Sequence, residues 1–543
     1  MISVPSCLAK ASVTWTRSRP WRHADTRRPL GGARSGVFSR RVLDSEVFQI
    51  MSVLQEIREL LRKRLLQLLT LAALMAGLGG YCFTLKYCVL DLDLWWHLGV
   101  GNWILQHHCV PRTGILSHTA ASRPWVAYSW GYEVLLSLTY RWFGLLGVGL
   151  LGVLLTLLVA GCVYWMLHRL SGRFWVATPL AVVTCWAFLF SLMPRPVFFS
   201  MVLFMVTLTL ILEAQRSGRV QTLYWLPLIF ALWANVHIQF IYGLFLLGLF
   251  VAVNLLQRLA DRLAVTPTFV LRPSLALKPL AAIFAICLLA TCIGPYSFHL
   301  YQVIFEYSKS KLPYEMIREL QPLNFRFGAH YAQLLLAAAG FFAVGYQKRL
   351  DPFKLALLII ASVVAFRTMR DSWFLCIPAA ACIADFPVED ARRDPAETPV
   401  ELAGLAAVVF VLLLLFAHNT DFNTRGLDAA ISSQFPVRAV NFLRQNPPPG
   451  PLYNDLNFGG FLIWYMPDYP VAIDGRNDLY GDELDHRFFS SANGNKSYAS
   501  DPYLNQAGVV LLGKDVPLVN LLKIDPRFTI IYEDRIAAVF VRR

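Results

Sequence analysis

Long apolar runs recur along most of this chain, and they limit its fold more than any other feature. The runs lie at approximately 65–90, 145–167, 174–192, 197–213, 221–236, 238–257, 279–294, 331–346, 353–367, 371–386 and 401–417. A helix crosses a bilayer with about 20 apolar residues, and the shortest spans have about 17. Only 15% of the residues are charged, whereas a soluble domain averages about 25%. The sequence therefore predicts an α-helical polytopic membrane protein with about eleven transmembrane helices.

The distribution of basic residues predicts the topology. Arg58, Arg62 and Arg64 precede the first run, and Lys and Arg beside a membrane helix stay in the cytoplasm. A helical stretch at 128–143 carries charged side chains, so we expect it to lie on the outer surface without crossing. The later basic loops then fall inside, which makes the N-terminus cytoplasmic and the C-terminal part extracytoplasmic. If 128–143 crossed, every later loop would change sides and the rule would be broken.

Changes in composition divide the chain into three parts. Residues 1–50 are rich in arginine and poor in acids, which indicates a basic, disordered N-terminal tail; a transit peptide or a true start at Met51 would leave the same pattern. The membrane part covers 51–417, with a first outer loop at 91–144 and a second outer loop at 295–330. Residues 418–543 are polar enough to fold in water, and we expect them to form an extracytoplasmic domain.

Short β-branched runs alternate with helical ones in 418–543, which predicts a small α/β domain. The runs expected to form strands are 451–453, 471–473, 508–512, 528–532 and 537–541. Within this domain Asp474 and Arg476 follow one strand-like run directly. Two interpretations of these two residues stay open: an internal salt bridge in a turn, and a site for an acceptor molecule.

The net charge of +14 has an ordinary explanation in a membrane protein, because cytoplasmic loops are basic and contact anionic lipid. We find no basic–aromatic module of the kind that binds nucleic acid, so the bilayer is the expected partner. The ten cysteines lie mostly within apolar runs and form no C-x-x-C pair. They are expected to be small buried side chains, with a Cys88–Cys109 disulfide as an alternative.

Asp91-Leu92-Asp93-Leu94-Trp95-Trp96-His97 follows the first apolar run directly. Ionisable groups beside hydrocarbon are costly and usually belong to a functional site. Asp91 or Asp93 could act as a general base, and both could bind a divalent metal, although the sequence requires none. The alternative is a carboxylate pair that anchors the loop at the interface. His97 lies four residues after Asp93 and could orient it on a helix, or it could be an ordinary interfacial residue.

Other polar residues lie at ends of apolar runs on the same predicted side of the membrane, and they are Arg195, Asn235, His237, Glu306, Arg367 and Arg370. Arg195 stands between two prolines, where it could bind phosphate or reach the lipid headgroups. Asn235 and His237 could bind substrate or connect helices by hydrogen bonds. Arg367 and Arg370 are three residues apart, on one face of a helix. Two cations outside the membrane run against the usual charge distribution, which favours an anion site. Glu306 could pair with them or coordinate a metal.

A basic start, one membrane helix and an acidic motif in the first outer loop resemble the GT-C superfamily of polytopic membrane glycosyltransferases. The resemblance is to uncharacterised bacterial members, and it covers the architecture of most of 51–420. It implies that 94–107 and 128–143 are interfacial helices, that Asp91 or Asp93 is the loop acid, and that Arg195, Arg367 and Arg370 hold a carrier phosphate. The W-W-D signature of oligosaccharyltransferases is absent, and Asp474-Gly475-Arg476 stands in the C-terminal domain instead.

Three classes of function follow as hypotheses. The resemblance implies a membrane glycosyltransferase that moves a sugar from a polyprenyl-phosphate donor to an unidentified acceptor on the outer face of the bacterial cytoplasmic membrane. A transporter or flippase of lipid-linked glycans would instead need ionisable residues at mid-bilayer and paired broken helices. The third class is a non-catalytic assembly or binding protein. Full activity after Asp91→Asn and Asp93→Asn would favour this third class.

Overall fold

The computed structural model describes residues 35–188, 195–262, 275–309, 312–347, 350–386, 394–395 and 397–543. The chain forms two compact units, Met1–Leu66 and Gln67–Arg543. In the first unit the described residues belong to helix α1 (Ser35–Leu85), which continues into the second unit. Most of the predicted basic tail, residues 1–34, lies outside the described part. All of the site residues predicted from the sequence lie in the second unit.

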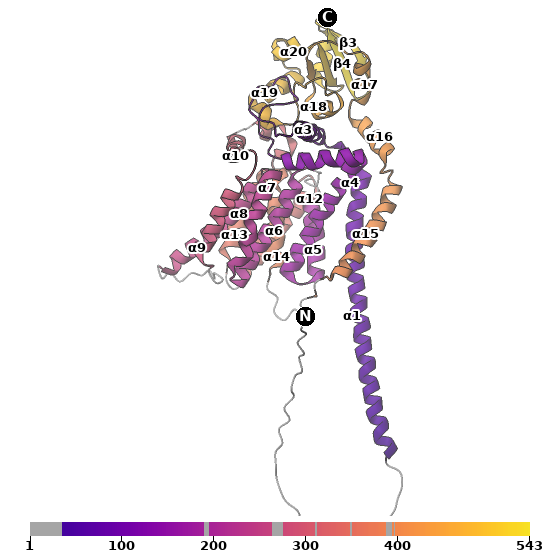
Figure 1. The fold of residues 1–543 in the computed structure, drawn as a ribbon, viewed down its shortest axis with the longest axis vertical. Helices are drawn as coiled ribbons and strands as arrows, with labels where there is room; N and C mark the ends of the chain where they lie inside the picture. Colours follow the sequence, from indigo (N-terminus) through magenta and orange to yellow (C-terminus); the bar gives the residue numbers. More distant parts are fainter. Residues whose placement is uncertain are drawn as a thin grey trace, which may run out of the picture. The chain divides into compact units, whose positions relative to one another are not determined.

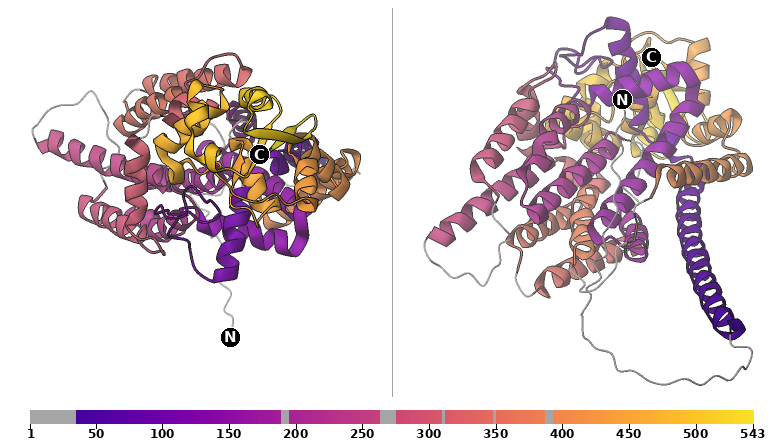
Figure 2. Two further views of the ribbon diagram at one scale, coloured as in Figure 1. Left: turned by 90° about the horizontal axis from the view of Figure 1, so that it is seen from above. Right: turned by 60° about the horizontal axis from the view of Figure 1, so that its bottom comes forward.

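The second unit is mostly helical, as predicted, and ends in a small sheet (Figures 1 and 2). After α1 its main helices are α2 (Tyr87–Leu90), α3 (Leu94–His107), α4 (Trp130–Ser171), α5 (Phe174–Ala187), α6 (Val197–Ser217), α7 (Leu226–Val236), α8 (Phe240–Arg262), α9 (Leu277–Ala290), α10 (His299–Lys309), α11 (Leu312–Met316), α12 (Gly328–Gly345), α13 (Pro352–Arg367), α14 (Trp373–Ala384) and α15 (Pro399–Asn419). Short 3₁₀ helices connect some of them: η2 (Val220–Trp225), η3 (Arg318–Leu320) and η4 (Met369–Asp371).

The apolar helices identify an integral membrane protein. Within the described residues, six segments are long and apolar enough to cross a bilayer: Leu61–Leu90, Trp130–Ser171, Val197–Ser217, Phe240–Ala260, Gly328–Gly345 and Pro399–Asn419. Three further apolar helices are shorter, at Phe174–Ala187, Val220–Val236 and Leu277–Ala290. The total of about eleven spans remains a prediction.

Helix α4 bends at Gly144, whose φ of 62° and ψ of −157° lie outside the helical region. Glycine reaches such a positive φ without the steric cost that a Cβ would add. Residues 130–143 therefore form one helical arm and 145–171 another, which run in different directions (Figure 1). The predicted helix at 128–143 is thus present as a separate arm, and its place on the membrane surface remains a prediction.

The C-terminal part contains the helices α16 (Thr424–Gln434), α17 (Val437–Gln445), α18 (Leu456–Tyr465), α19 (Asn477–Ala492), α20 (Pro502–Gln506) and α21 (Pro517–Ile524), together with η5 (Lys496–Ser500). Its strands are β1 (Leu452–Asn454), β2 (Val509–Gly513), β3 (Phe528–Glu533) and β4 (Ala537–Arg542), in the order β1-β2-β4-β3. β1 and β2 are parallel, while β4 is antiparallel to both β2 and β3. The small α/β arrangement predicted from the sequence is present.

One predicted strand was wrong. Residues 471–473 do not join the sheet, and Val471 forms only an isolated bridge with Ser117 of the first outer loop. The Asn454 side chain instead forms hydrogen bonds with the backbone of this segment. Its Oδ1 accepts from Ala472 N (2.8 Å), and its Nδ2 donates to Ile473 O (2.8 Å). An apolar β-branched run shows that a segment is buried, but the partner of its backbone depends on the tertiary structure.

Helix α3 connects the helical bundle to the C-terminal part, because it packs on both α4 and α18 (Figure 1). Trp95 is fully buried and makes edge contacts with Phe435 and Phe461, at ring-centroid distances of 5.8 Å each. On the other side of the helix, Gly101 faces the backbone carbonyl of Glu133 so closely that a Cβ would overlap it. These contacts hold the Asp91–His97 stretch between two packed layers, which limits its freedom of movement.

Candidate functional site

Arg195 binds Asp91 through two parallel hydrogen bonds. Its Nε donates to Oδ2 at 2.8 Å and its Nη2 donates to Oδ1 at 2.7 Å. The Asp91 side chain is only 1% exposed, and Oδ1 also accepts the backbone N–H of Asp93 at 3.2 Å. A bidentate arginine–carboxylate pair is both strong and directional. Asp91 is therefore fully engaged in holding Arg195 in place.

Asp93 is the more accessible of the two acids, with a side chain 25% exposed. Its Oδ1 accepts a hydrogen bond from Trp96 Nε1 at 3.0 Å, and its Oδ2 lies 3.3 Å from Arg195 Nη1. Gly475 lies against Oδ1 so closely that a Cβ there would overlap it. The same Arg195 nitrogen donates to Glu319 Oε2 at 3.0 Å. Three carboxylates thus share one guanidinium, which gives the cluster a net negative charge.

His97 pairs with an acid that the sequence did not single out as part of the site. Its Nδ1 lies 3.2 Å from Glu133 Oε1, and both side chains are buried. Burial, followed by the positive charge of Arg195, lowers the pKa of His97 well below its ordinary value, so the imidazole is neutral at physiological pH. The other oxygen of Glu133, Oε2, has no hydrogen-bond partner among the described residues. In the sequence Glu133 stood out only as a charge on the predicted surface helix.

His237 is oriented by two side chains from α6 and α7. Trp233 Nε1 donates to Ser200 Oγ at 2.8 Å, and Ser200 Oγ lies 2.7 Å from His237 Nδ1. Burial, and then the charge of Arg370, lowers the pKa of His237 to about 3, so the ring is neutral. Because Ser200 Oγ already accepts from Trp233, we expect its hydroxyl proton to point to Nδ1, which would leave the ring proton on Nε2.

These side chains surround a polar pocket of about 200 Å³. Its charged and polar lining is Asp93, His97, Tyr128, Ser129, Arg195, His237, Tyr307, Glu319, Arg370, Asn457, Asn477 and Asp478. Of the residues predicted from the sequence, the pocket therefore brings together Asp93, His97, Arg195, His237 and Arg370. Within the part of the chain that the structure describes, Arg370 makes no ion pair or hydrogen bond. It is a cation without a partner on the wall of this pocket.

An apolar cavity of about 560 Å³ adjoins the polar pocket. Its walls include Ala187, Val197, Phe327 and Met369, together with the polar side chains Arg318, His330, Gln333 and Ser372. Four residues line both spaces, and they are Arg195, Val197, Glu319 and Arg370. The unpaired Arg370 thus lies where a polar space meets an apolar one.

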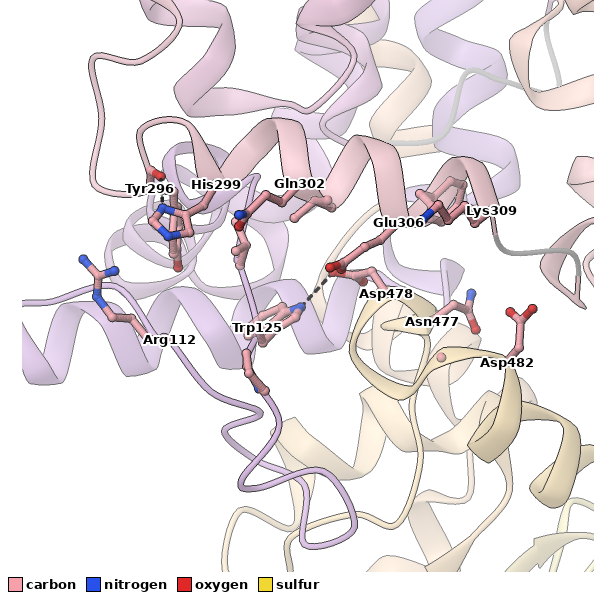
Figure 3. A pocket seen from close by; sticks show the side chains of 15 residues that line it. Arg112, Trp125, Tyr296, His299, Gln302, Glu306, Lys309, Asn477, Asp478 and Asp482 are labelled. Carbon is pink, nitrogen blue, oxygen red and sulfur yellow. Dashed lines mark hydrogen bonds between the residues drawn. The ribbon is translucent and has the colours of Figure 1, made fainter.

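A third cavity, of about 570 Å³, opens between the loop that joins α3 to α4, α10 and α19 (Figure 3). Glu306 lies here, with Arg112, His299 and Lys309 among the other side chains around the space. Asp478 lines both this cavity and the polar pocket.

Asp478 accepts a hydrogen bond from Trp125 Nε1 at 2.9 Å (Figure 3). Burial raises its pKa to about 6, against the opposing effects of Trp125 and Arg476.

The remaining predicted residues lie outside the polar pocket. Asn235 connects the indole of Trp130 to the backbone of Ile293. Its Oδ1 accepts from Trp130 Nε1 (3.1 Å), and its Nδ2 donates to Ile293 O (2.6 Å). Arg367 is exposed and lies over the Tyr314 ring, 5.3 Å from its centroid. These contacts give both residues a structural explanation.

Asp474 and Arg476 form a buried, two-pronged ion pair, with Nε–Oδ1 at 2.8 Å and Nη2–Oδ2 at 2.7 Å. Both side chains are 0% exposed, and Tyr480 Oη donates to Asp474 Oδ2 at 2.6 Å. Of the two interpretations left open by the sequence, the structure supports the internal salt bridge. The pair orders the turn that carries Gly475 and Asn477 to the polar pocket.

A metal role for Asp91 and Asp93 remains a prediction. Among the described residues, no group of three or more His, Cys, Asp or Glu side chains is arranged to hold a metal ion. Both acids are bound to Arg195 instead.

No protein-family model matches the chain, and no curated protein sequence matches it. Solved structures do resemble it. One is the archaeal oligosaccharyltransferase AglB from Archaeoglobus fulgidus, in complex with an inhibitory peptide and a dolichol-phosphate. It has 11% sequence identity and a TM-score of 0.49, and the match covers 82% of this chain and 69% of that one. Another is ArnT from Cupriavidus metallidurans bound to undecaprenyl phosphate. It has 13% identity and a TM-score of 0.42, with 86% and 97% of the two chains covered.

Both matches have sequence identities below 25% and TM-scores below 0.5, so the resemblance to the GT-C superfamily remains a prediction. The roles of individual residues rest on the geometry of this chain.

Proposed function

We propose that this protein transfers a glycosyl group from a polyprenyl-phosphate donor to a hydroxyl group of an acceptor. The supporting observation is the junction at Arg370, where an unpaired cation faces both the polar pocket and the apolar cavity. A polyprenyl-phosphate sugar has the same sequence of chemistries: an apolar tail, an anion and a polar ring. In the proposed complex the tail enters the apolar cavity, the phosphate binds Arg370, and the sugar occupies the polar pocket.

Asp93 is the proposed general base. It is the more exposed member of the acid pair, and a hydrogen bond from Trp96 and an ion pair with Arg195 hold its orientation. In the transfer step the acceptor oxygen bonds to the anomeric carbon, and the bond from that carbon to the phosphate oxygen breaks. The hydroxyl proton passes to the Asp93 carboxylate, and the electron pair of the broken bond stays on the departing phosphate. General base catalysis of this kind typically contributes about 10²- to 10⁴-fold.

Arg370 stabilises the charge that develops on the leaving phosphate, since a fixed cation in a water-poor site acts strongly on such charge. Neutral His237 would direct its Nε2–H toward the same anion. His97 is a second neutral imidazole on the pocket wall, anchored through Nδ1 to Glu133. Asp91 is a positioning residue, because it reaches the pocket only through Arg195.

The decisive experiment uses the purified full-length chain in detergent or lipid with a panel of polyprenyl-phosphate sugars and mixed acceptors. Sugar transfer is expected with at least one donor. Asp93→Asn should abolish it, whereas Asp468→Asn, at an exposed acid of the C-terminal part, should not. Absence of transfer with every donor by folded protein, or full transfer by Asp93→Asn, would contradict the proposal.

We also propose that the pocket faces the extracytoplasmic side, with the N-terminus in the cytoplasm. The charge distribution of the loops supports this orientation. Cys109 of the first outer loop is exposed, so a membrane-impermeant maleimide should label it in intact bacterial cells. The Cys109→Ser variant is the control. Labelling of Cys109 only after the membrane is opened would reverse the orientation.

A further inference from the structure

A fourth cavity, of about 490 Å³, lies in the C-terminal part at the carboxyl edge of the parallel pair β1–β2. Tyr453 and Asn454 belong to the end of β1, Asp455 follows it, and Leu512 lies near the end of β2. In α/β sheets, ligands bind outside the carboxyl ends of parallel strands, since the connections leave a crevice there. We call this space the carboxyl-edge cavity.

Most of its wall is apolar. Phe488 and Phe489 come from α19, Leu512 comes from β2, and Val516 follows β2. Phe489 is 37% exposed although it is a large hydrophobic side chain. A cavity lined by apolar side chains, with a few polar groups, is the usual form of a small-molecule site.

Asp485 is one of three acids in this wall, with Glu319 and Asp455. Its Oδ1 is buried and has no hydrogen-bond partner among the described residues. Buried polar atoms are almost always paired, so Asp485, which lines this cavity, is an acid whose side chain keeps an unused acceptor. Burial, and then the negative charges of Asp474, Asp482 and Asp478, raise the pKa of Asp485 to about 8, while Arg123 opposes the shift. The local field therefore favours a cation and disfavours an anion.

The carboxyl-edge cavity continues into the polar pocket. Ile317, Glu319, Leu456, Asn457 and Asn477 line both spaces. A molecule held in the cavity would extend past the two asparagines toward the pocket that contains Asp93. The apolar cavity beside Arg370 shares Arg318 and Glu319 with the carboxyl-edge cavity.

We propose that the carboxyl-edge cavity binds the acceptor, and that the acceptor is an amphipathic amine that also carries the reacting hydroxyl group: its apolar group packs on Phe488 and Phe489, and its ammonium group pairs with Asp485. The acceptor role rests on the proposed glycosyl transfer, but the binding of an amphipathic amine does not. A purely apolar occupant would leave the Asp485 oxygen without a donor. An anionic occupant would face the surrounding carboxylates.

The test measures binding of phenethylamine to the full-length protein by saturation-transfer NMR, beside 2-phenylethanol and 3-phenylpropionate, which have the same ring without the positive charge. The amine should bind at least about tenfold more tightly than the alcohol, because a charge-assisted hydrogen bond replaces a neutral one. Asp485→Asn should remove this preference. Glu483→Gln, two residues away on the same helix and 82% exposed, should keep it, and Ala492→Leu should reduce binding of both ring compounds by filling the cavity.

Amine binding should also strengthen as the pH rises from about 6.5 to about 9, because Asp485 ionises near pH 8 while the amine stays protonated. The pH dependence of amine binding should vanish in Asp485→Asn. The other charged groups around the cavity remain unchanged in that variant, and they are Arg123, Arg318, Glu319, Asp455, Asp474, Asp478 and Asp482.

Equal binding of amine and alcohol, no saturable binding of either, or unchanged preference in Asp485→Asn would overturn the proposal. The binding result is independent of sugar transfer. If the protein binds the amine but transfers no sugar, the proposed enzyme activity fails and the binding site stands. If it transfers sugar but shows no preference for the amine, the proposed binding site fails and the proposed enzyme activity stands.

Discussion

Arg195 and Asp91 are 104 residues apart in the chain and meet in a two-pronged ion pair, with both nitrogen–oxygen distances below 3.0 Å. This pair separates the roles of two acids that are almost adjacent in sequence. Asp91 is buried against the arginine, while Asp93 faces the pocket. An acid that holds a guanidinium in place affects folding, whereas an accessible acid can exchange a proton with a ligand.

The first prediction compares Asp91→Asn with Asp93→Asn. Loss of a charged hydrogen bond from a buried site costs about 1.5–3 kcal/mol, so Asp91→Asn should lower the free energy of unfolding by about that amount. Asp93→Asn should change stability little and reduce sugar transfer by about 10²- to 10⁴-fold. Thermal unfolding followed by tryptophan fluorescence, beside the transfer assay, distinguishes the two effects. Equal stability loss in both variants would contradict the assignment.

The second prediction compares Arg367, the last residue of α13, with Arg370 of η4. Arg370→Gln should raise the KM for the lipid-linked donor by about 10- to 100-fold, because one charge-assisted contact to phosphate is lost. Arg367 lies three residues earlier, and its side chain faces Tyr314. Arg367→Gln removes the same charge there, so the KM of this variant should stay within about twofold of the parent value. A similar effect of both substitutions would show that general positive potential, and not a phosphate contact, is responsible.

The third prediction concerns the tautomer of His237. Ser200→Ala removes the hydroxyl that donates to Nδ1, so the ring should become a mixture of the two neutral tautomers. Nitrogen-15 NMR of labelled histidine should report the Nε2–H form in the parent protein and the mixture in Ser200→Ala. Thr207→Ala is the matched control, since Thr207 is also buried on α6 but donates to its own helix, at Leu203 O (2.7 Å). An unchanged spectrum in Ser200→Ala would show that the Ser200 hydroxyl does not determine the tautomer of His237.

The fourth prediction concerns the buried ion pair of Asp474 and Arg476. Asp474→Asn leaves Arg476 buried without its counter-ion, and such a change costs about 3–5 kcal/mol. Asp525→Asn removes an acid from a pair whose arginine is 29% exposed, so its cost should be about 1 kcal/mol or less. Chemical denaturation of both variants checks the difference. Sugar transfer by Asp474→Asn at low temperature, where it is still folded, should persist at a reduced rate.

The fifth prediction concerns pH and stability. The pKa of Asp485 is about 8 in the folded protein and about 3.9 in an unfolded chain. Between these values the folded state binds more protons than the unfolded state, so this group lowers stability as pH rises from about 4 to about 8. Asp485→Asn lacks that contribution. The difference in Tm between the variant and the parent protein should therefore increase in favour of the variant over this range, and a constant difference would contradict the prediction.

Much of the architecture could be predicted from local patterns. The apolar runs indicated membrane helices because the spacing and length of hydrophobic residues determine whether a helix can be buried in lipid. The helix at 94–107 and the separate helical arm before Gly144 were also predicted correctly. The strand expected at 471–473 was wrong, since its backbone partners are the side chain of Asn454 and the first outer loop.

The sequence by itself determined that this chain is an integral membrane protein with an acidic motif after its first apolar run, because hydrophobicity and local spacing are properties of contiguous residues. Only the tertiary structure decided which polar residues meet. It joined Asp91 to Arg195 and His97 to Glu133, left Arg370 facing the pocket and turned Arg367 away. Ion pairs between distant segments depend on how helices pack, and the local pattern of residues in a sequence does not predict that packing.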